Sequence, residues 1–290
     1  MEEAAKGMQE VLASLEKKSA EMKSNPLSAV DGTGREPDYQ CPVCKDQTGW
    51  LERVEGVEKW VICPCIRERR TQRLLQFSEI TESFRNVTFG QFQTDNMDPQ
   101  VASMKEAALA YYSNYQDLRK QRENSMLIMG VPGCGKTHIL TALSNNLMQR
   151  KKIEDEGGQQ QGISVQYFPY VEGFNDLRDD FNLLERKMER MKKADVLFID
   201  DLFKPVKQWT KDGYERVPRA TAWQIEQMYA VINHRYLNHL PILVSTELIM
   251  EELVDVDDAL ASRIVQMCKS FLVTIAGAKN DLNYRLKGVY

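Results

Sequence analysis

The residue pattern with the most specific chemistry is a phosphate-binding loop at residues 130–137. These residues read Gly-Val-Pro-Gly-Cys-Gly-Lys-Thr and match G-x-x-x-x-G-K-[ST]. In such a loop the glycines let backbone N–H groups point at phosphate oxygens, the lysine reaches the β- and γ-phosphates, and the final hydroxyl binds Mg²⁺. The sequence therefore predicts ATP and Mg²⁺ as ligands; the alternative is a glycine-rich turn that binds nothing. The predicted nucleotide contacts are Gly130, Val131, Pro132, Gly133, Cys134, Gly135, Lys136 and Thr137, with Thr137 also on Mg²⁺.

The residues around the loop predict the elements that position it. A short apolar run at 125–129 precedes the loop, and the stretch after Thr137 has helical periodicity. The helix would add its positive N-terminal end to the phosphate site. The alternation of strands and helices predicts an α/β fold, in which helices cover both faces of a five-stranded parallel sheet. The other four strands are expected at 164–168, 196–199, 242–245 and 271–275.

Two carboxylates, Asp200 and Asp201, follow the predicted strand 196–199. An ATPase of the phosphate-loop class needs such groups beside its nucleotide. We expect Asp200 to bind Mg²⁺ and Asp201 to polarise the attacking water as general base. Glutamate is commoner at the second position, so the shorter aspartate predicts modest turnover. The alternative is that both are ordinary surface acids at a strand end.

Polar residues also end the predicted strand 242–245. In a parallel sheet that binds its ligand at the carboxyl ends of the strands, Ser245 or Thr246 would lie near the γ-phosphate. Arg263 stands alone in an otherwise apolar helical stretch. It is either an arginine finger offered to the ATP of a neighbouring subunit or a snorkelling side chain.

Four of the six cysteines cluster near the start of the chain. Two cysteine pairs that flank a hairpin place four thiolates at the corners of a tetrahedron, as in zinc ribbons. A structural Zn²⁺ would replace a core too small to fold alone. A redox role for the C-x-x-C pair is the alternative, but the β-α-β context that it needs is missing. The predicted zinc ligands are Cys41, Cys44, Cys63 and Cys65.

The composition is that of an ordinary globular chain, with 290 residues, 42% hydrophobic residues and a formal net charge of −4. No apolar run approaches the roughly 20 residues that span a bilayer, so we expect a cytoplasmic protein without a membrane partner. The acidic balance excludes a surface that binds nucleic acid everywhere, so any DNA contact needs a local basic groove. We expect a helix within 1–24, a linker at 25–40, and two domains, 1–78 and 79–290.

In this order the motifs resemble the AAA+ ATPases, and within them the DnaC/DnaI-type replicative-helicase loaders, a group that includes the transposition helper ATPases. The resemblance covers nearly the whole chain, and Arg263 and Arg285 look like the finger and sensor-2 arginines of that family. The family's sensor-1 strand usually ends with Asn where this chain has Glu247, so we assign that role to Ser245 or Thr246. The segments that carry the resemblance are the cysteine module with the arginine-rich helix after it, residues 80–89, GVPGCGKT, FIDDLF, Asn233-His-Arg235-Tyr236, PILVSTEL, Ser262-Arg263-Ile264 and Asn283-Tyr-Arg285-Leu.

The resemblance implies an ATP-dependent loader that places the hexameric replicative helicase on single-stranded DNA during replication initiation. Residues 1–78 would bind the helicase, and the AAA+ domain would self-associate with ATP at the subunit interface. Two alternatives remain. One is a transposition helper ATPase, against which the cysteine module weighs. The other is a nucleotide-gated DNA-binding adaptor with negligible hydrolysis.

Two stretches carry clustered cations. After Asp201, four cations alternate with two aromatic residues, which suits single-stranded nucleic acid because bases stack and phosphates pair; the alternative is an ordinary exposed loop. The residues concerned are Lys204, Lys207, Lys211, Arg216, Trp209 and Tyr214. A predicted helix after the cysteine module carries arginines that form either a solvated face or a phosphate-contacting patch, namely Arg67, Arg69, Arg70 and Arg73.

Overall fold

The computed structural model describes residues 39–54, 57–66, 69, 84–95, 97–150, 162–177, 180–210, 213–277 and 282–283. The chain divides into two compact units, Met1–Ile66 and Arg67–Tyr290, and each is described by itself. Several expectations fall outside the described residues and stay predictions. They are the helix within 1–24, the linker up to residue 38, the domain boundary at 78, and the roles of Arg67, Arg70, Arg73, Lys211 and Arg285.

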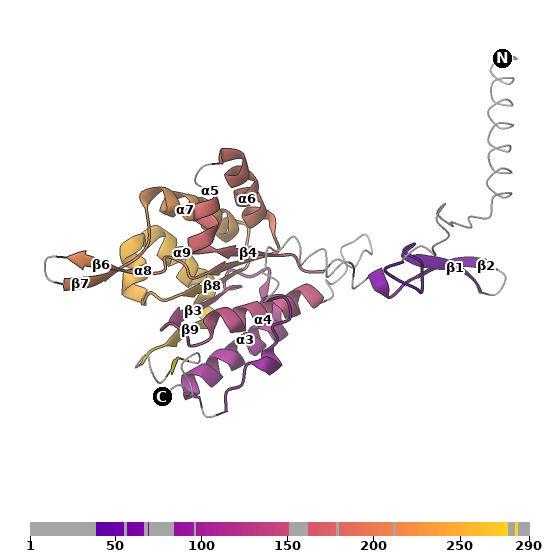
Figure 1. Cartoon of the computed structure of the whole chain (residues 1–290), viewed down its shortest axis with the longest axis horizontal. Helices are drawn as coiled ribbons and strands as arrows, with labels where there is room; N and C mark the ends of the chain where they lie inside the picture. Colours follow the sequence, from indigo (N-terminus) through magenta and orange to yellow (C-terminus); the bar gives the residue numbers. More distant parts are fainter. Residues whose placement is uncertain are drawn as a thin grey trace, which may run out of the picture. The chain divides into compact units, whose positions relative to one another are not determined.

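In the first unit, residues 39–66 form a cysteine module around a hairpin of β1 (Gly49–Val54) and β2 (Val57–Ile62), drawn in indigo in Figure 1. The strands are antiparallel, with Leu51 opposite Trp60. The buried hydrophobic side chains of the module are those of three cysteines, with Trp50 and Cys65 packed against them. The module therefore has almost no apolar core of its own.

The second unit is built on a parallel sheet of five strands in the order β4-β5-β8-β3-β9. Each neighbouring pair is parallel. The α/β prediction is confirmed, and every predicted strand agrees with the observed one within one residue at each end. The strands are β3 (Met126–Gly130), β4 (Val165–Pro169), β5 (Val196–Asp200), β8 (Ile242–Thr246) and β9 (Leu272–Ile275).

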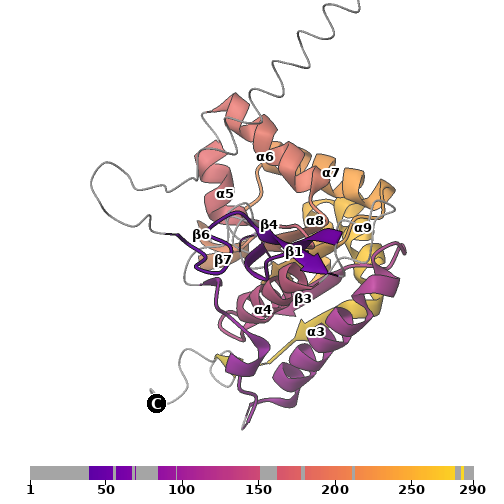
Figure 2. The same ribbon diagram turned by 90° about the vertical axis from the view of Figure 1, so that its right-hand side faces the viewer.

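Helices cover both faces of this sheet, as Figures 1 and 2 show. Side chains of α3 and α4 form an apolar core on one face, and those of α5 to α9 form a second core on the other. None of the helices that the structure describes is long and apolar enough to cross a membrane. The helices are α3 (Pro99–Leu118), α4 (Lys136–Gln149), α5 (Tyr170–Leu177), α6 (Phe181–Lys193), α7 (Ala222–Leu237), α8 (Met250–Val256) and α9 (Asp258–Cys268), with short 3₁₀ turns η2 (Phe89–Gln91) and η3 (Lys269–Phe271).

A second hairpin interrupts the α/β order between β5 and α7. Its strands are β6 (Val206–Thr210) and β7 (Gly213–Val217), and they pair Trp209 with Tyr214. Figure 1 shows the hairpin extending away from the helices of the second unit. An ordinary exposed loop was one of the two interpretations given for this stretch, but its sequence also carries a hairpin signal, because Asp-Gly at 212–213 is typical of a tight hairpin turn.

Candidate functional site

The phosphate-binding loop joins β3 to α4, so a strand precedes it and a helix follows it as the sequence predicted. Its three glycines all have positive φ angles. At two of them the missing side chain also leaves room for a neighbouring residue. A Cβ on Gly135 would lie 2.4 Å from the Phe92 ring, and one on Gly133 would lie 2.1 Å from Oδ1 of Asn283. Asn283 therefore lies against the loop. It belongs to the C-terminal motif of the family resemblance. Gly135 caps α4 without a side-chain hydrogen bond, which leaves the amides of its first turn directed at the loop.

Lys136 and Thr137 lie in the first turn of α4. The ammonium of Lys136 is buried and donates hydrogen bonds to the carbonyls of Gly130 (2.8 Å) and Val131 (3.0 Å). The hydroxyl of Thr137 donates to Oδ1 of Asp200 at 2.9 Å. The structure thus brings together a hydroxyl and a carboxylate 63 positions apart in the sequence. Hard oxygen ligands of this kind are those that Mg²⁺ prefers.

Asp200 is a buried carboxylate at the end of β5. It accepts hydrogen bonds from Ser245 (2.5 Å), Thr137 and Tyr167 (3.3 Å). Burial raises the pKa of Asp200, and the charge of Asp201 adds to this, while the three hydrogen bonds oppose it. A nearby cation would relieve the cost of this buried negative charge. The residues therefore fit a bound Mg²⁺.

Asp201 has a left-handed backbone, with φ 55°. Its amide donates to the Ser245 hydroxyl at 2.8 Å, so Ser245 holds both aspartates in place. Its carboxylate accepts a hydrogen bond from Lys204 at 2.5 Å, and Lys204 also lies 3.8 Å from Glu247. Sequence reasoning treated Lys204 as a possible DNA contact and gave no signal for this ion pair.

The two hydroxyls at the end of β8 have different surroundings. Ser245 contacts the carboxylate of Asp200, whereas the hydroxyl of Thr246 donates to the carbonyl of Leu202 at 2.8 Å and accepts from the amide of Leu248 at 3.1 Å. Both side chains are buried. Ser245 thus belongs to the carboxylate network, and Thr246 holds the turns that follow β5 and β8.

Arg263 lies on α9 and packs against α7 of its own chain. Its Nε donates to Oδ1 of Asn233 at 3.0 Å, and its Nη1 donates to the carbonyl of Ala259 at 2.6 Å. The guanidinium carbon lies 5.0 Å from the ring centroid of Tyr229 and 5.6 Å from that of Tyr236. A finger role would therefore require Arg263 to exchange these partners for a phosphate of a neighbouring subunit.

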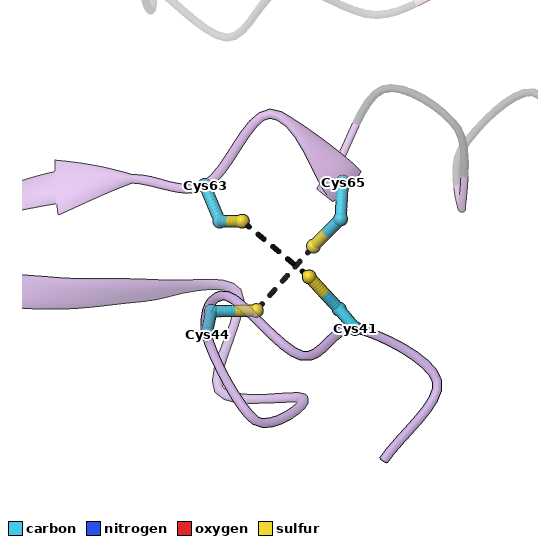
Figure 3. Close-up of side chains that lie close together, drawn as sticks. All are labelled: Cys41, Cys44, Cys63 and Cys65. Atoms are coloured by element: carbon cyan, nitrogen blue, oxygen red, sulfur yellow. Dashed lines mark hydrogen bonds between the residues drawn. The ribbon is translucent and has the colours of Figure 1, made fainter.

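The four clustered cysteines converge on one point, as Figure 3 shows. Their sulfur atoms all lie within 4.8 Å of one another, with 3.7 Å between Cys41 and Cys63 and 3.4 Å between Cys44 and Cys65. Four thiolates at zinc–sulfur distances of about 2.3 Å would stand about 3.8 Å apart at the corners of a tetrahedron. The cluster therefore has the size of a Cys₄ zinc site with no open position.

The local environment prepares these thiols for a cation. A backbone hydrogen bond from Cys44 lowers the pKa of the Cys41 thiol to about 7. Burial and the neighbouring sulfurs raise the pKa of Cys65 to about 12. One thiolate forms readily, whereas further thiolates repel it unless a positive ion lies between them. This pattern suits Zn²⁺ rather than a redox pair.

No protein-family model matches the chain. Phage-like element PBSX protein XkdC of Bacillus subtilis (strain 168) is 49% identical to it over 251 residues, which cover 87% of this chain and 88% of XkdC. This chain belongs to the XkdC family. Uncharacterized protein YqaM of the same organism is 45% identical over 224 residues, which cover 77% of this chain and 66% of YqaM.

Among solved structures, a candidate primosome component of Streptococcus pyogenes serotype M3 has a TM-score of 0.50 and 15% identity, and the match covers 69% of this chain and 91% of that one. This likeness concerns the fold. The second unit of this XkdC-family chain, from here on called the ATPase unit, has a DnaC/DnaI-like AAA+ fold, which confirms the family resemblance drawn from the motifs. An AAA+ fold with an intact phosphate loop indicates ATP binding and hydrolysis as the chemistry to be tested.

Proposed function

We propose that this protein is an ATP-dependent loader that places a hexameric replicative helicase on single-stranded DNA during replication initiation. The observation that carries the ATPase part is the hydrogen bond between Thr137 and Asp200 beside the phosphate loop. The DnaC/DnaI-like fold supports the loader part.

In the proposed hydrolytic step, the loop amides and Lys136 would hold the phosphates, and Thr137 and Asp200 would hold Mg²⁺. Bound there, Mg²⁺ would neutralise negative charge on the phosphates. Asp201 accepts a proton from the attacking water, and Ser245 fixes the direction of both aspartates. Closing the loop around nucleotide requires Lys136 to leave the carbonyls of Gly130 and Val131.

Residues 1–78 are proposed as the partner-docking domain, and residues 79–290 as the ATPase domain. The cysteine module supports this because it exposes an apolar face. Leu51, Trp60 and Ile62 share one face of the β1–β2 hairpin and are 62%, 54% and 62% exposed. Exposed apolar faces of this kind typically mark contacts with another protein. A zinc-held hairpin would present that face in a fixed shape to the helicase.

Single-stranded DNA is the proposed ligand of the β6–β7 hairpin. Trp209 and Tyr214 are 69% and 70% exposed, and their ring centroids lie 4.2 Å apart. Exposed aromatic faces stack on bases without sequence preference. Arg216 is not assigned to the DNA contact, because its guanidinium donates hydrogen bonds to Glu252 and to the carbonyl of Glu247.

A nucleotide-gated adaptor with negligible hydrolysis is the second candidate function. The ion pair between Asp201 and Lys204 favours it, because a carboxylate oxygen held by an ammonium is a poor acceptor for a water proton. Turnover measured with and without single-stranded DNA separates the two functions. A loader with DNA-stimulated hydrolysis increases its turnover, and an adaptor stays near zero under both conditions.

The decisive test of the loader is a helicase-loading assay with the full chain, Mg²⁺-ATP and a single-stranded DNA circle. Wild-type protein should deposit helicase on the circle, and Lys136→Ala should not, because it lacks the phosphate contact. Loading by Lys136→Ala at the wild-type rate would contradict the proposal. So would affinity capture with ATP that yields a transposase in place of a helicase.

The proposed finger role of Arg263 has its own test. Arg263→Ala should bind ATP normally and lose DNA-stimulated hydrolysis, since the finger acts on a neighbour's nucleotide. Asn233→Ala, which removes one partner of Arg263 within the chain, is the matched control and should not reduce hydrolysis. Normal hydrolysis by Arg263→Ala would refute the finger role.

A further inference from the structure

Lys204 lies two residues before β6, and its ammonium faces two carboxylates. Nζ is 2.5 Å from Oδ2 of Asp201 and 3.8 Å from Oε1 of Glu247. Partial burial lowers the pKa of Lys204, but the hydrogen bond to Asp201 and the charges of Asp201 and Glu247 outweigh it and raise the pKa. The side chain therefore stays a cation between two possible partners.

The closer of the two carboxylates is the one that would activate water. The backbone of Asp201 is fixed, because its φ is 55° and its amide is held by Ser245. The backbone therefore keeps Asp201 beside Lys204. While Oδ2 accepts the ammonium's hydrogen bond, it is a weaker acceptor for a proton from water. A movement of Lys204 would free Oδ2, and Glu247 is a second anionic partner 3.8 Å away.

The hairpin connects this pair to a distant surface. Lys204 lies two residues before the first strand of the hairpin, β6. On its second strand, Arg216 donates to both carboxylate oxygens of Glu252, at 3.2 and 3.3 Å, and to the backbone carbonyl of Glu247. The base of the hairpin is thus attached to the end of β5 through one strand and to the end of β8 through the other. A displacement of the hairpin would change the position of Lys204 relative to Asp201 and Glu247.

We propose that Lys204 is a positioning residue that holds Asp201 in an ion pair and frees it by exchanging Asp201 for Glu247 when the β6–β7 hairpin moves. This rests on the proposed function, in which Asp201 is the general base for ATP hydrolysis. Glu247 supplies the second partner. Hydrolysis is then restrained until a ligand engages the hairpin.

Steady-state kinetics of the full chain test this directly. Lys204→Gln should raise the basal kcat by roughly two- to fivefold, the factor that matches a partly exposed ion pair, and leave KM for ATP unchanged. Glu247→Gln should lower kcat, because Lys204 then has Asp201 as its remaining partner. The matched control is Lys269→Gln, which removes an exposed lysine paired with Glu123 at 3.7 Å and should change neither constant.

A double-variant comparison separates this inference from the proposed function. In an Asp201→Asn background, Lys204→Gln should have no effect on kcat, since the pair it breaks is already lost. If Asp201→Asn is inactive but Lys204→Gln does not exceed wild type, the inference is wrong and the proposed function stands. If Asp201→Asn turns over like wild type, or if neither wild type nor Lys204→Gln hydrolyses ATP, both are wrong.

A second measurement needs no turnover. An amine-reactive ester applied to the nucleotide-free protein should label Lys204 more slowly than Lys269, as read by peptide mass spectrometry. Asp201→Asn should speed the labelling of Lys204 and leave that of Lys269 unchanged. Labelling of Lys204 at the Lys269 rate in the wild-type protein would overturn the inference, and so would an unchanged rate in Asp201→Asn.

Discussion

The cysteine module and the ATPase unit are held together by different physical means. In the ATPase unit, helices bury both faces of the sheet, and the strands β5 and β8 are buried along their whole length. In the module, the buried hydrophobic side chains are those of Cys41, Cys44 and Cys63, whereas Leu51 and Trp60 are exposed. The sheet can therefore organise the nucleotide site without a ligand, but the shape of the module depends on the ion that its thiolates bind.

Metal removal should produce the largest difference in stability between the two units. A zinc chelator should unfold the module, because structural zinc sites supply an apparent binding free energy of about 10–16 kcal/mol at pH 7. Limited proteolysis should then cleave within residues 39–66 while the ATPase unit stays resistant. Cys44→Ser should behave in the same way without chelator. Protection of 39–66 in the chelated protein would mean that the module has another source of stability.

A core substitution should produce the reverse result. Phe198→Ala, at a fully buried position of β5, should lower the free energy of unfolding of the ATPase unit by about 3–5 kcal/mol. Urea denaturation measures this loss. The zinc content per chain should not change, because Phe198 belongs to the other unit. A loss of zinc in this variant would show that the two units fold as one.

Substituting one exposed tryptophan in each unit should show which unit binds DNA and which binds the helicase. Trp209→Ala should weaken single-stranded DNA binding by about 1–3 kcal/mol through lost stacking, with stability changed by less than about 0.5 kcal/mol. Trp60→Ala should leave DNA affinity unchanged and reduce helicase capture. Fluorescence anisotropy with an oligonucleotide and a pull-down measure the two effects. Equal DNA affinity of Trp209→Ala and wild type would exclude the hairpin as the DNA contact.

The smallest expected effect is a pH-dependent one at Asp200. Because its pKa is raised in the folded state, wild-type protein loses stability as pH rises from the ordinary aspartate pKa of 3.8 through the raised value. Asp200→Asn cannot ionise, so its stability advantage in the nucleotide-free protein should grow with pH over that range and then level off. Urea melts across the acidic range measure it, and added Mg²⁺-nucleotide should reverse the order. An advantage that shrinks as pH rises would contradict the cause assigned here.

Sequence patterns predicted the ATPase sheet and the positions of the site residues because both have local signals. Apolar runs of strand length defined β3 and β5, and the glycine spacing defined the loop. The cysteine spacing likewise predicted the cluster that the structure forms. Each of these signals depends only on residue types and spacing within a short segment of the chain.

The contacts that tune the site had no such signal. The ion pair between Lys204 and Asp201 depends on a left-handed backbone that the sequence does not announce. The partners of Ser245 and Thr246 are Asp200 and Leu202, which the pairing of β5 with β8 brings beside them. The packing of Arg263 between α9 and the tyrosines of α7 depends on how two helices lie together. Such features come from tertiary packing, so only the folded structure reveals them.

The strand order has a consequence for what this site tolerates. Because β8 lies between β3 and β5, the ends of those two strands stand two inter-strand spacings apart, about 10 Å in all. Parallel ladders on both sides fix the register of β8. A single residue inserted or deleted in β8 ahead of Ser245 would turn Ser245 to the other face of the sheet and leave Asp200 facing a different side chain. The length of this one strand therefore sets which side chain meets Asp200 at the nucleotide site.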